Sequence, residues 1–237
     1  MKKKMKWFGF LAGFILLLFL FQWQFSDNNS WESWNLPLTG KVIYLDPGHG
    51  GPDGGAVGST LQEKDVALSI SLKLRDYLQE QGALVLMTRE EDVDLADKDT
   101  SGYSRRKVED LKKRVEIINE SEAELFLSIH LNAIPSAKWS GAQTFYHGKF
   151  VENENVAKFI QDELRRNLEN TERVAKPING IYLLNKVEKP GALVEVGFLS
   201  NPLEEKMLST EEYQEEVAAS IYNGILRYFS NEENPPD

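Results

Sequence analysis

The sequence lacks cysteine altogether and holds three histidines among its 237 residues. Without cysteine, no disulfide framework, cysteine-based zinc ribbon or thiol nucleophile can form. A metal site in this chain would therefore need histidine and carboxylate ligands. The absence of cysteine is also compatible with an exported protein.

Positive charge is scarce as well. The chain has 27 basic and 37 acidic residues, a formal net charge of −10. Four of the lysines lie within the first six residues, so the remainder of the chain carries about −14. Nucleic-acid binding requires clustered lysine and arginine to meet the phosphates. We therefore exclude nucleic acid as a partner and interpret most of the acidic surplus as solvated surface.

One long hydrophobic run is present, at the N-terminus. About 17 apolar residues follow the lysines, between the length of a signal-peptide core and that of a comfortable membrane span. No small-x-small cleavage site follows the run. We interpret residues 1–24 as an uncleaved signal-anchor, with a cleaved signal peptide as the alternative. The lysines keep the N-terminus cytoplasmic, so the rest of the chain is expected outside the membrane, anchored through this segment or secreted.

The remainder of the chain indicates one domain. Residues 25–40 are polar, contain Pro37 and Gly40, and are typical of a linker. Residues 41–229 alternate strand and helix patterns, and residues 230–237 form a polar tail. We expect strands at 41–46, 83–88, 124–130, 141–148, 180–185 and 192–198, with helices between most of them. Such alternation predicts a single α/β domain with a largely parallel sheet, which binds ligands beyond the carboxyl ends of its strands.

A glycine-rich segment, YLDPGHGGPDGGAVG at 44–58, follows the first expected strand. It fails as a dinucleotide fingerprint because Asp53 stands where the third glycine should be. It fails as a P-loop because Ala56 and Val57 replace the lysine and the hydroxyl residue. A tight turn explains the glycines, which permit positive φ and close backbone approach. It does not explain a histidine at the end of a strand.

A metal site explains that histidine. His49 ends the first expected strand, Glu63 opens the following helix, and His130 ends the third strand, so a parallel sheet would bring them to one edge. Two imidazoles and a carboxylate form a known ligand set for catalytic zinc. Each residue also has a structural interpretation: strand-end histidines are commonly hydrogen-bonded, and Glu63 suits a first helical turn. His147 is interpreted as a loop residue, with a competing metal ligand as the alternative.

A fourth residue, Glu195, interrupts the apolar run ALVEVGF. A buried carboxylate is costly unless it is paired or functional. It is either a salt-bridged core residue or, beside a metal, a general base. In the second case it would take a proton from an activated water and deliver it to a leaving amine.

Five segments, LDPGHGGPDGGAVG, EKDVAL, MTR, LFLSIHLNA and ALVEVGFLSN, together resemble the catalytic domain of zinc-dependent N-acetylmuramoyl-L-alanine amidases. The resemblance runs from about residue 41 to 229, in order and with compatible spacing. It implies a mixed six-stranded α/β fold, one zinc ion, and hydrolysis of the amide between the muramic acid lactyl group and L-alanine in peptidoglycan. By position it makes His49, Glu63 and His130 the zinc ligands and Glu195 the catalytic carboxylate.

Two further residues match motif positions. Arg89 in MTR and Asn132 in IHLNA are candidates for substrate contact, although a structural role comes first for both. The chain departs from the family pattern in the longer, charged loop 90–106 and at Ile118, which replaces the usual alanine. These departures leave the four central positions intact and the substrate preference open.

The arrangement of one domain behind an N-terminal hydrophobic segment is similar to germination-specific amidases of spore formers. That similarity implies a role in the spore cortex, where peptide removal allows muramic lactam to form, and a location between the forespore membranes. The alternatives are a metal-dependent peptidase or deacetylase acting on the wall, and a non-catalytic wall-binding module. The sequence leaves open whether a partner protein activates the enzyme.

Overall fold

The computed structural model describes residues 7, 11–19, 22, 36–230, 232 and 235. The chain divides into two compact units, residues 1–36 and residues 37–237. In the first unit, residues 11–19 are helical. No helix among the described residues has the length and apolar character needed to cross a membrane. The expected signal-anchor, linker and tail lie largely outside the described residues and stay predictions.

The second unit is built on one six-stranded sheet in the order β2-β1-β3-β6-β4-β5. Four strand pairs are parallel, and only β4 and β6 run antiparallel. The expected mixed, mostly parallel sheet of a single α/β domain is therefore confirmed. The strands are β1 (Val42–Pro47), β2 (Leu84–Met87), β3 (Leu125–Asn132), β4 (Gln143–Tyr146), β5 (Lys176–Pro177) and β6 (Gly191–Phe198).

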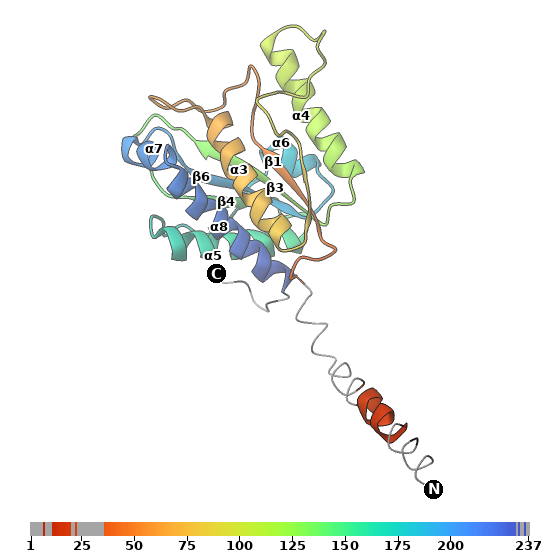
Figure 1. The fold of residues 1–237 in the computed structure, drawn as a ribbon. Helices are drawn as coiled ribbons and strands as arrows, with labels where there is room; N and C mark the ends of the chain where they lie inside the picture. Colours follow the sequence, from red (N-terminus) through yellow and green to blue (C-terminus); the bar gives the residue numbers. More distant parts are fainter. Residues whose placement is uncertain are drawn as a thin grey trace. The chain divides into compact units, whose positions relative to one another are not determined.

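Helices cover both faces of the sheet (Figure 1). One face packs against α3 (Glu63–Glu80), α5 (Val151–Leu168) and α8 (Glu211–Phe229), and the other against α4 (Tyr103–Glu120) and α6 (Tyr182–Lys186). The short helix α7 (Pro202–Leu208) follows β6. The apolar stripe of α3 is buried because its members recur every fourth residue on one helical face: Val66, Ile70, Leu74 and Leu78.

The strand expected at 180–185 is wrong. This segment forms helix α6, and the sixth strand is β5, two residues long. Leu183 and Leu184 are both buried in the core beneath α4. Successive residues of a strand would point to opposite faces, so a helical turn is the conformation that buries both. A short apolar run does not distinguish these two cases by periodicity.

Helix α7 was not expected, although its start carries a sequence signal. Asn201 is the N-cap, and its side chain accepts hydrogen bonds from the backbone N–H groups of Leu203 and Glu204. Pro202 stands at the first helical position, where its missing N–H costs nothing. The Asn201-Pro202 pair, directly after β6, therefore marks the start of this helix.

The last residues of the expected linker pack onto the domain. Leu38 is fully buried in the core, and its N–H donates to the carbonyl of Gln81 at the end of α3. The carboxyl ends of β1, β3 and β6 then meet at one edge of the sheet, since these strands are mutually parallel. This edge carries the candidate site.

Candidate metal centre

Three side chains gather at the carboxyl edge of the sheet. His49 follows β1, Glu63 is the first residue of α3, and His130 lies near the end of β3. Their possible ligand atoms all lie within 4.8 Å of one another. His130 Nδ1 is 2.8 Å from Glu63 Oε1, and His49 Nε2 is 3.2 Å from Glu63 Oε2. Two imidazoles and one carboxylate at such distances match the donor set of a zinc centre with an open position.

The glycine loop makes room for this cluster. His49 has a left-handed backbone (φ 62°), which is uncommon for a residue with a Cβ and typical of functional sites. A Cβ on Gly48 would collide with the His130 ring. A Cβ on Gly55 would lie 2.5 Å from Glu63 Oε2 and 2.7 Å from the His49 ring. These two glycines therefore permit the close approach of the three side chains.

Asp53 orients His49. Its Oδ2 lies 2.9 Å from His49 Nδ1, while Tyr103 Oη and Lys107 Nζ from α4 also contact the Asp53 carboxylate. With Nδ1 engaged, the Nε2 atom of His49 faces the centre. Burial alone would lower the pKa of His49, but the hydrogen bonds to Asp53 and Glu63 outweigh it and raise the pKa to about 9. The sequence reading missed Asp53, whose signal is its position four residues after a loop histidine.

Glu195 faces the same site from β6. It lies opposite His130 in the β3–β6 pair, and its Oε2 atom is buried without a hydrogen-bond partner. No described residue forms an ion pair with it, so the alternative of a salt-bridged core glutamate finds no support. Burial, reinforced by the Glu63 carboxylate, raises the pKa of Glu195 to about 7 despite the two histidines. With both histidines, Glu195 lines a cavity of about 210 Å³.

Beneath the site, Asp46 and Arg114 form a buried ion pair. Arg114 Nη1 donates to Asp46 Oδ1 at 2.6 Å, and Ser128 and Thr88 donate to the same carboxylate. Arg114 also donates to the carbonyls of Pro47 and His49. Arg114 from α4 therefore joins the ends of β1 and β2 below the candidate ligands, and Ser128 links β3 to the same Asp46 carboxylate. Neither Asp46 nor Arg114 was among the candidate site residues predicted from the sequence.

Arg89 has a structural environment. It is 4% exposed, and its guanidinium donates to the backbone carbonyls of Pro47, Gly48, Lys64 and Glu91. It thus fixes the glycine loop to the start of α3. Asn132 is half-buried at the end of β3, where its carbonyl accepts from the N–H of Leu199. Substrate contact by Arg89 or Asn132 stays a prediction.

His147 lies apart from the centre. It follows β4, which runs antiparallel to β6, so the end of β4 lies at the opposite edge of the sheet. Its carbonyl accepts a hydrogen bond from Asn153. Within the part of the chain that the structure describes, no other three histidine, aspartate or glutamate side chains gather as His49, Glu63 and His130 do.

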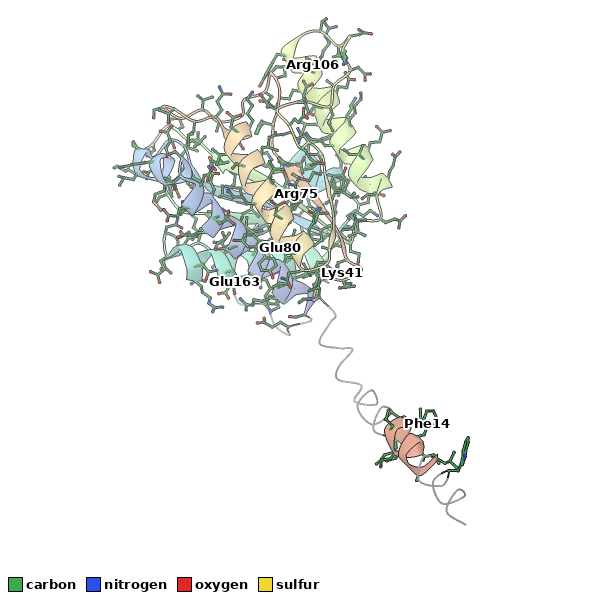
Figure 2. The ribbon with its side chains drawn as sticks, in the orientation of Figure 1. Phe14, Lys41, Arg75, Glu80, Arg106 and Glu163 are labelled. Atoms are coloured by element: carbon green, nitrogen blue, oxygen red, sulfur yellow. The ribbon has the colours of Figure 1, made fainter. Side chains whose placement is uncertain are left out.

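The long charged segment 90–106 is anchored to the domain by ion pairs. Arg106, labelled in Figure 2, donates to both carboxylate oxygens of Asp94. Asp92 accepts from Lys64 and from the backbone N–H of Gly51 in the glycine loop. This segment therefore connects α4 to the loop that carries His49.

Comparisons with known proteins show which proteins this chain resembles. Residues 43–227 match the family described as N-acetylmuramoyl-L-alanine amidase. The germination-specific N-acetylmuramoyl-L-alanine amidase of Bacillus subtilis (strain 168) is 69% identical over 237 residues, all of both chains. The amidase LytC of the same organism is 32% identical over 195 residues, 81% of this chain and 36% of that protein.

Solved structures share the fold. The CwlD amidase from Clostridioides difficile, in complex with the GerS lipoprotein, aligns with a TM-score of 0.78 and 44% identity, covering 80% of this chain and 98% of that one. The catalytic domain of CwlV from Bacillus (Paenibacillus) polymyxa var. colistinus aligns with a TM-score of 0.68 and 30% identity, covering 80% and 98%.

Proposed function

The chain belongs to the N-acetylmuramoyl-L-alanine amidase family, and from this premise we propose that His49, Glu63 and His130 hold one zinc ion, with Glu195 as the acid–base group. The enzyme hydrolyses the amide between the lactyl group of muramic acid and L-alanine in peptidoglycan. The observation that carries the proposal is the meeting of three ligand-type side chains within 4.8 Å beside a buried carboxylate oxygen without a partner.

The residues fit zinc by their chemistry. Neutral imidazole nitrogen and carboxylate oxygen are its usual non-sulfur ligands. Bound there, zinc would supply a Lewis acid that lowers the pKa of a water molecule toward about 7 and polarises the scissile carbonyl. Asp53, through Nδ1 of His49, would fix the ring that presents Nε2 to the ion.

Glu195 moves the proton in this proposal. Its unpartnered Oε2 takes a proton from the attacking water and then returns it to the leaving nitrogen of L-alanine. Burial keeps its pKa near 7, close to the working pH, where a group both accepts and releases a proton readily. Such a role contributes about 10²–10⁴-fold to the rate.

The cellular role and location are inferred from the relatives. Because a germination-specific amidase is 69% identical over the full chain, we assign this enzyme to the spore cortex, where it would remove stem peptides from muramic acid. That role is extracytoplasmic and suits the space between the forespore membranes. A solved relative was crystallised with a lipoprotein, so a protein partner for this chain belongs to the same proposal, as does attachment through the N-terminal segment.

Digestion of purified peptidoglycan tests the proposal. The protein with zinc should release stem peptides bearing a new N-terminal L-alanine, detected by mass spectrometry, and a chelator should stop the release. A wall peptidase or a deacetylase would yield no such terminus. A wall-binding module would release nothing.

Two variants separate the roles of the residues. Glu195→Gln should keep one zinc per chain, measured by atomic emission, and lose about 10²–10⁴-fold in rate. His130→Ala should lose the metal itself. Failure of the wild-type protein to retain stoichiometric zinc, or unchanged turnover in His130→Ala, would refute the metal assignment.

A further inference from the structure

One arginine, Arg173, lies over two aromatic rings, one of which is Phe198 at the end of β6. The guanidinium carbon of Arg173 is 5.3 Å from the ring centroid of Trp139 and 5.3 Å from that of Phe198. Trp139 is 50% exposed, and Arg173 is half-buried. We call these three residues the Arg173 platform. Contact with two aromatic rings restricts a guanidinium that would otherwise sample many rotamers.

A register shift in β6 places Phe198, one member of the Arg173 platform, on the face of the sheet that carries Glu195. His130 lies opposite Glu195, but Asn132 lies opposite Phe198, so two steps along β3 correspond to three along β6. Side chains alternate between the faces of a strand, and one extra residue reverses that alternation. Phe198 therefore shares the face of Glu195, His130 and Asn132, just beyond the candidate general base.

A second contact links Arg173 to Glu195. Gln143 lies opposite Glu195 in the antiparallel β4–β6 pair. The Gln143 side-chain oxygen accepts a hydrogen bond from Arg173 Nη1 at 3.2 Å. Residues directly opposite in such a pair have Cβ atoms about 5 Å apart. The side chain of Gln143 therefore separates the guanidinium of Arg173 from Glu195, the candidate general base.

Arg173 retains unused binding capacity. Its Nε donates to the carbonyl of Ser140, a long contact of 3.4 Å, and no described residue accepts from Nη2 or forms an ion pair with it. The neighbouring Glu204 carboxylate is occupied by the backbone N–H groups of Gly141 and Phe198. The charge of Arg173 acts on Glu204, but the two side chains form no ion pair. In a chain with a net charge of −10, an arginine without an ion pair in the described part of the chain, one strand away from Glu195, indicates a ligand with negative charge.

We propose that Arg173 binds a carboxylate of the peptide stem and so selects substrates by the charge of that stem. This inference rests on the proposed amidase function. Around the scissile amide, the glycan is uncharged and the stem carries the carboxylates, so the stem supplies the anion. Arginine pairs with carboxylates through two parallel N–H groups. Among the described residues, Nη1 and Nε of Arg173 each donate to one acceptor and Nη2 to none, so the guanidinium can still present such a pair.

The test compares muropeptide substrates in which each stem carboxylate is replaced in turn by a carboxamide. For the wild-type protein, one replacement should raise KM about 10–100-fold with little change in kcat, the loss expected for a hydrogen bond to a charged group. Arg173→Gln should show the raised KM with the fully charged stem and no further loss with the amide. Arg173→Lys, which keeps the charge without the planar fork, should retain part of the preference.

Arg166→Gln is the matched control, since Arg166 is an exposed arginine on α5, paired with Glu163 three residues before it. It should leave every KM unchanged. The inference is overturned if no carboxamide affects the wild-type protein, if Arg173→Gln keeps the preference, or if Arg173→Gln slows charged and amidated substrates equally.

Binding of the released stem peptide, measured by calorimetry, separates this inference from the amidase assignment. Wild-type protein should bind the charged peptide about tenfold more tightly than the amidated one, and Arg173→Gln should bind both equally. A protein without turnover that still shows this difference would refute the reaction and keep the subsite. A protein with turnover but without this difference would do the reverse.

Discussion

Asp46 is a fully buried carboxylate that the fold keeps charged. Burial by itself would raise its pKa, but Arg114 and the hydroxyl of Ser128 outweigh burial and hold the pKa below its usual value. Replacing Asp46 would leave Arg114, which is buried and poorly solvated, with the Asp110 carboxylate as its remaining ion-pair partner. Folding stability at this junction therefore depends on the charge of Asp46.

This dependence predicts a pH effect on stability. Because the folded pKa lies below the unfolded value near 3.9, the contribution of Asp46 is complete above that value and is lost as the pH falls through the folded pKa. Asp46→Asn should lower the free energy of unfolding at pH 7 by about 3–5 kcal/mol. Urea unfolding at several pH values from about 7 down to about 2 should show a smaller acid loss in the variant than in the wild-type protein.

The control is Asp76→Asn, which changes an exposed aspartate on α3. It should alter the unfolding free energy by less than about 1 kcal/mol. Equal acid sensitivity of Asp46→Asn and wild-type protein would contradict the assigned role of the pair.

At the scale of elements, close approach between segments is set by glycine. Gly55 combines a positive φ of 69° with a position against Glu63 and His49. Gly224 on α8 allows that helix to approach α5, because a Cβ there would lie 2.6 Å from the backbone of Ile160. The first glycine serves the site and the second serves the core, so their substitution should have different consequences.

Gly55→Ala should weaken zinc binding about 10–100-fold, since displaced supporting groups typically have an effect of this size. Gly40→Ala is the matched control, because Gly40 also has a positive φ but no atom within 4 Å of a Cβ. The Gly40→Ala variant should therefore have only the backbone strain of alanine at a positive φ, about 1–2 kcal/mol. Competition with a chromophoric chelator measures both variants, and equal affinities would show that crowding at Gly55 is unimportant.

Gly224→Ala should destabilise the fold by about 1–3 kcal/mol through overpacking between α5 and α8. Zinc affinity should stay at the wild-type value, because neither helix supplies a ligand. Gly148→Ala, at a glycine with open space around it, provides the comparison. Thermal unfolding with and without zinc tests this, and a loss of zinc affinity in Gly224→Ala would argue against the separation of core and site.

For the whole molecule, the three candidate ligands come from separate parts of the chain. His49 follows β1, Glu63 begins α3 and His130 lies on β3. An ion shared by these elements would be bound by the folded state and not by the unfolded chain. Metal occupancy and folding stability are therefore coupled.

Zinc at about 100 times its dissociation constant should stabilise the protein by about 2.7 kcal/mol. For a domain of this size the unfolding temperature should rise by about 5–11 °C. His130→Ala should show no rise, whereas Glu195→Gln should respond as the wild-type protein does. Calorimetry at fixed protein concentration provides the measurement, and an equal rise in His130→Ala would mean that zinc binds elsewhere.

Much of the fold followed from patterns within single elements. The four-residue spacing on α3 and the apolar runs of β1, β3 and β6 depend on burial of one face, which is a local property of the sequence. The family resemblance added the mixed six-stranded sheet and assigned roles to His49, Glu63, His130 and Glu195, which their chemistry and placement had already indicated. A short apolar run, such as residues 180–185, is compatible with both a strand and a helix, so the sequence did not decide between them.

From the sequence alone, most strands and helices, the family, and the side chains at strand ends could be predicted. Which distant residues contact one another became clear only from the folded arrangement. Asp53 receives Tyr103 and Lys107, Asp46 receives Arg114, and Trp139 and Phe198 enclose Arg173. The spacing of apolar residues along the sequence indicates which face of one helix or strand is buried. A contact between residues dozens of positions apart depends instead on strand order, strand direction and a one-residue register shift.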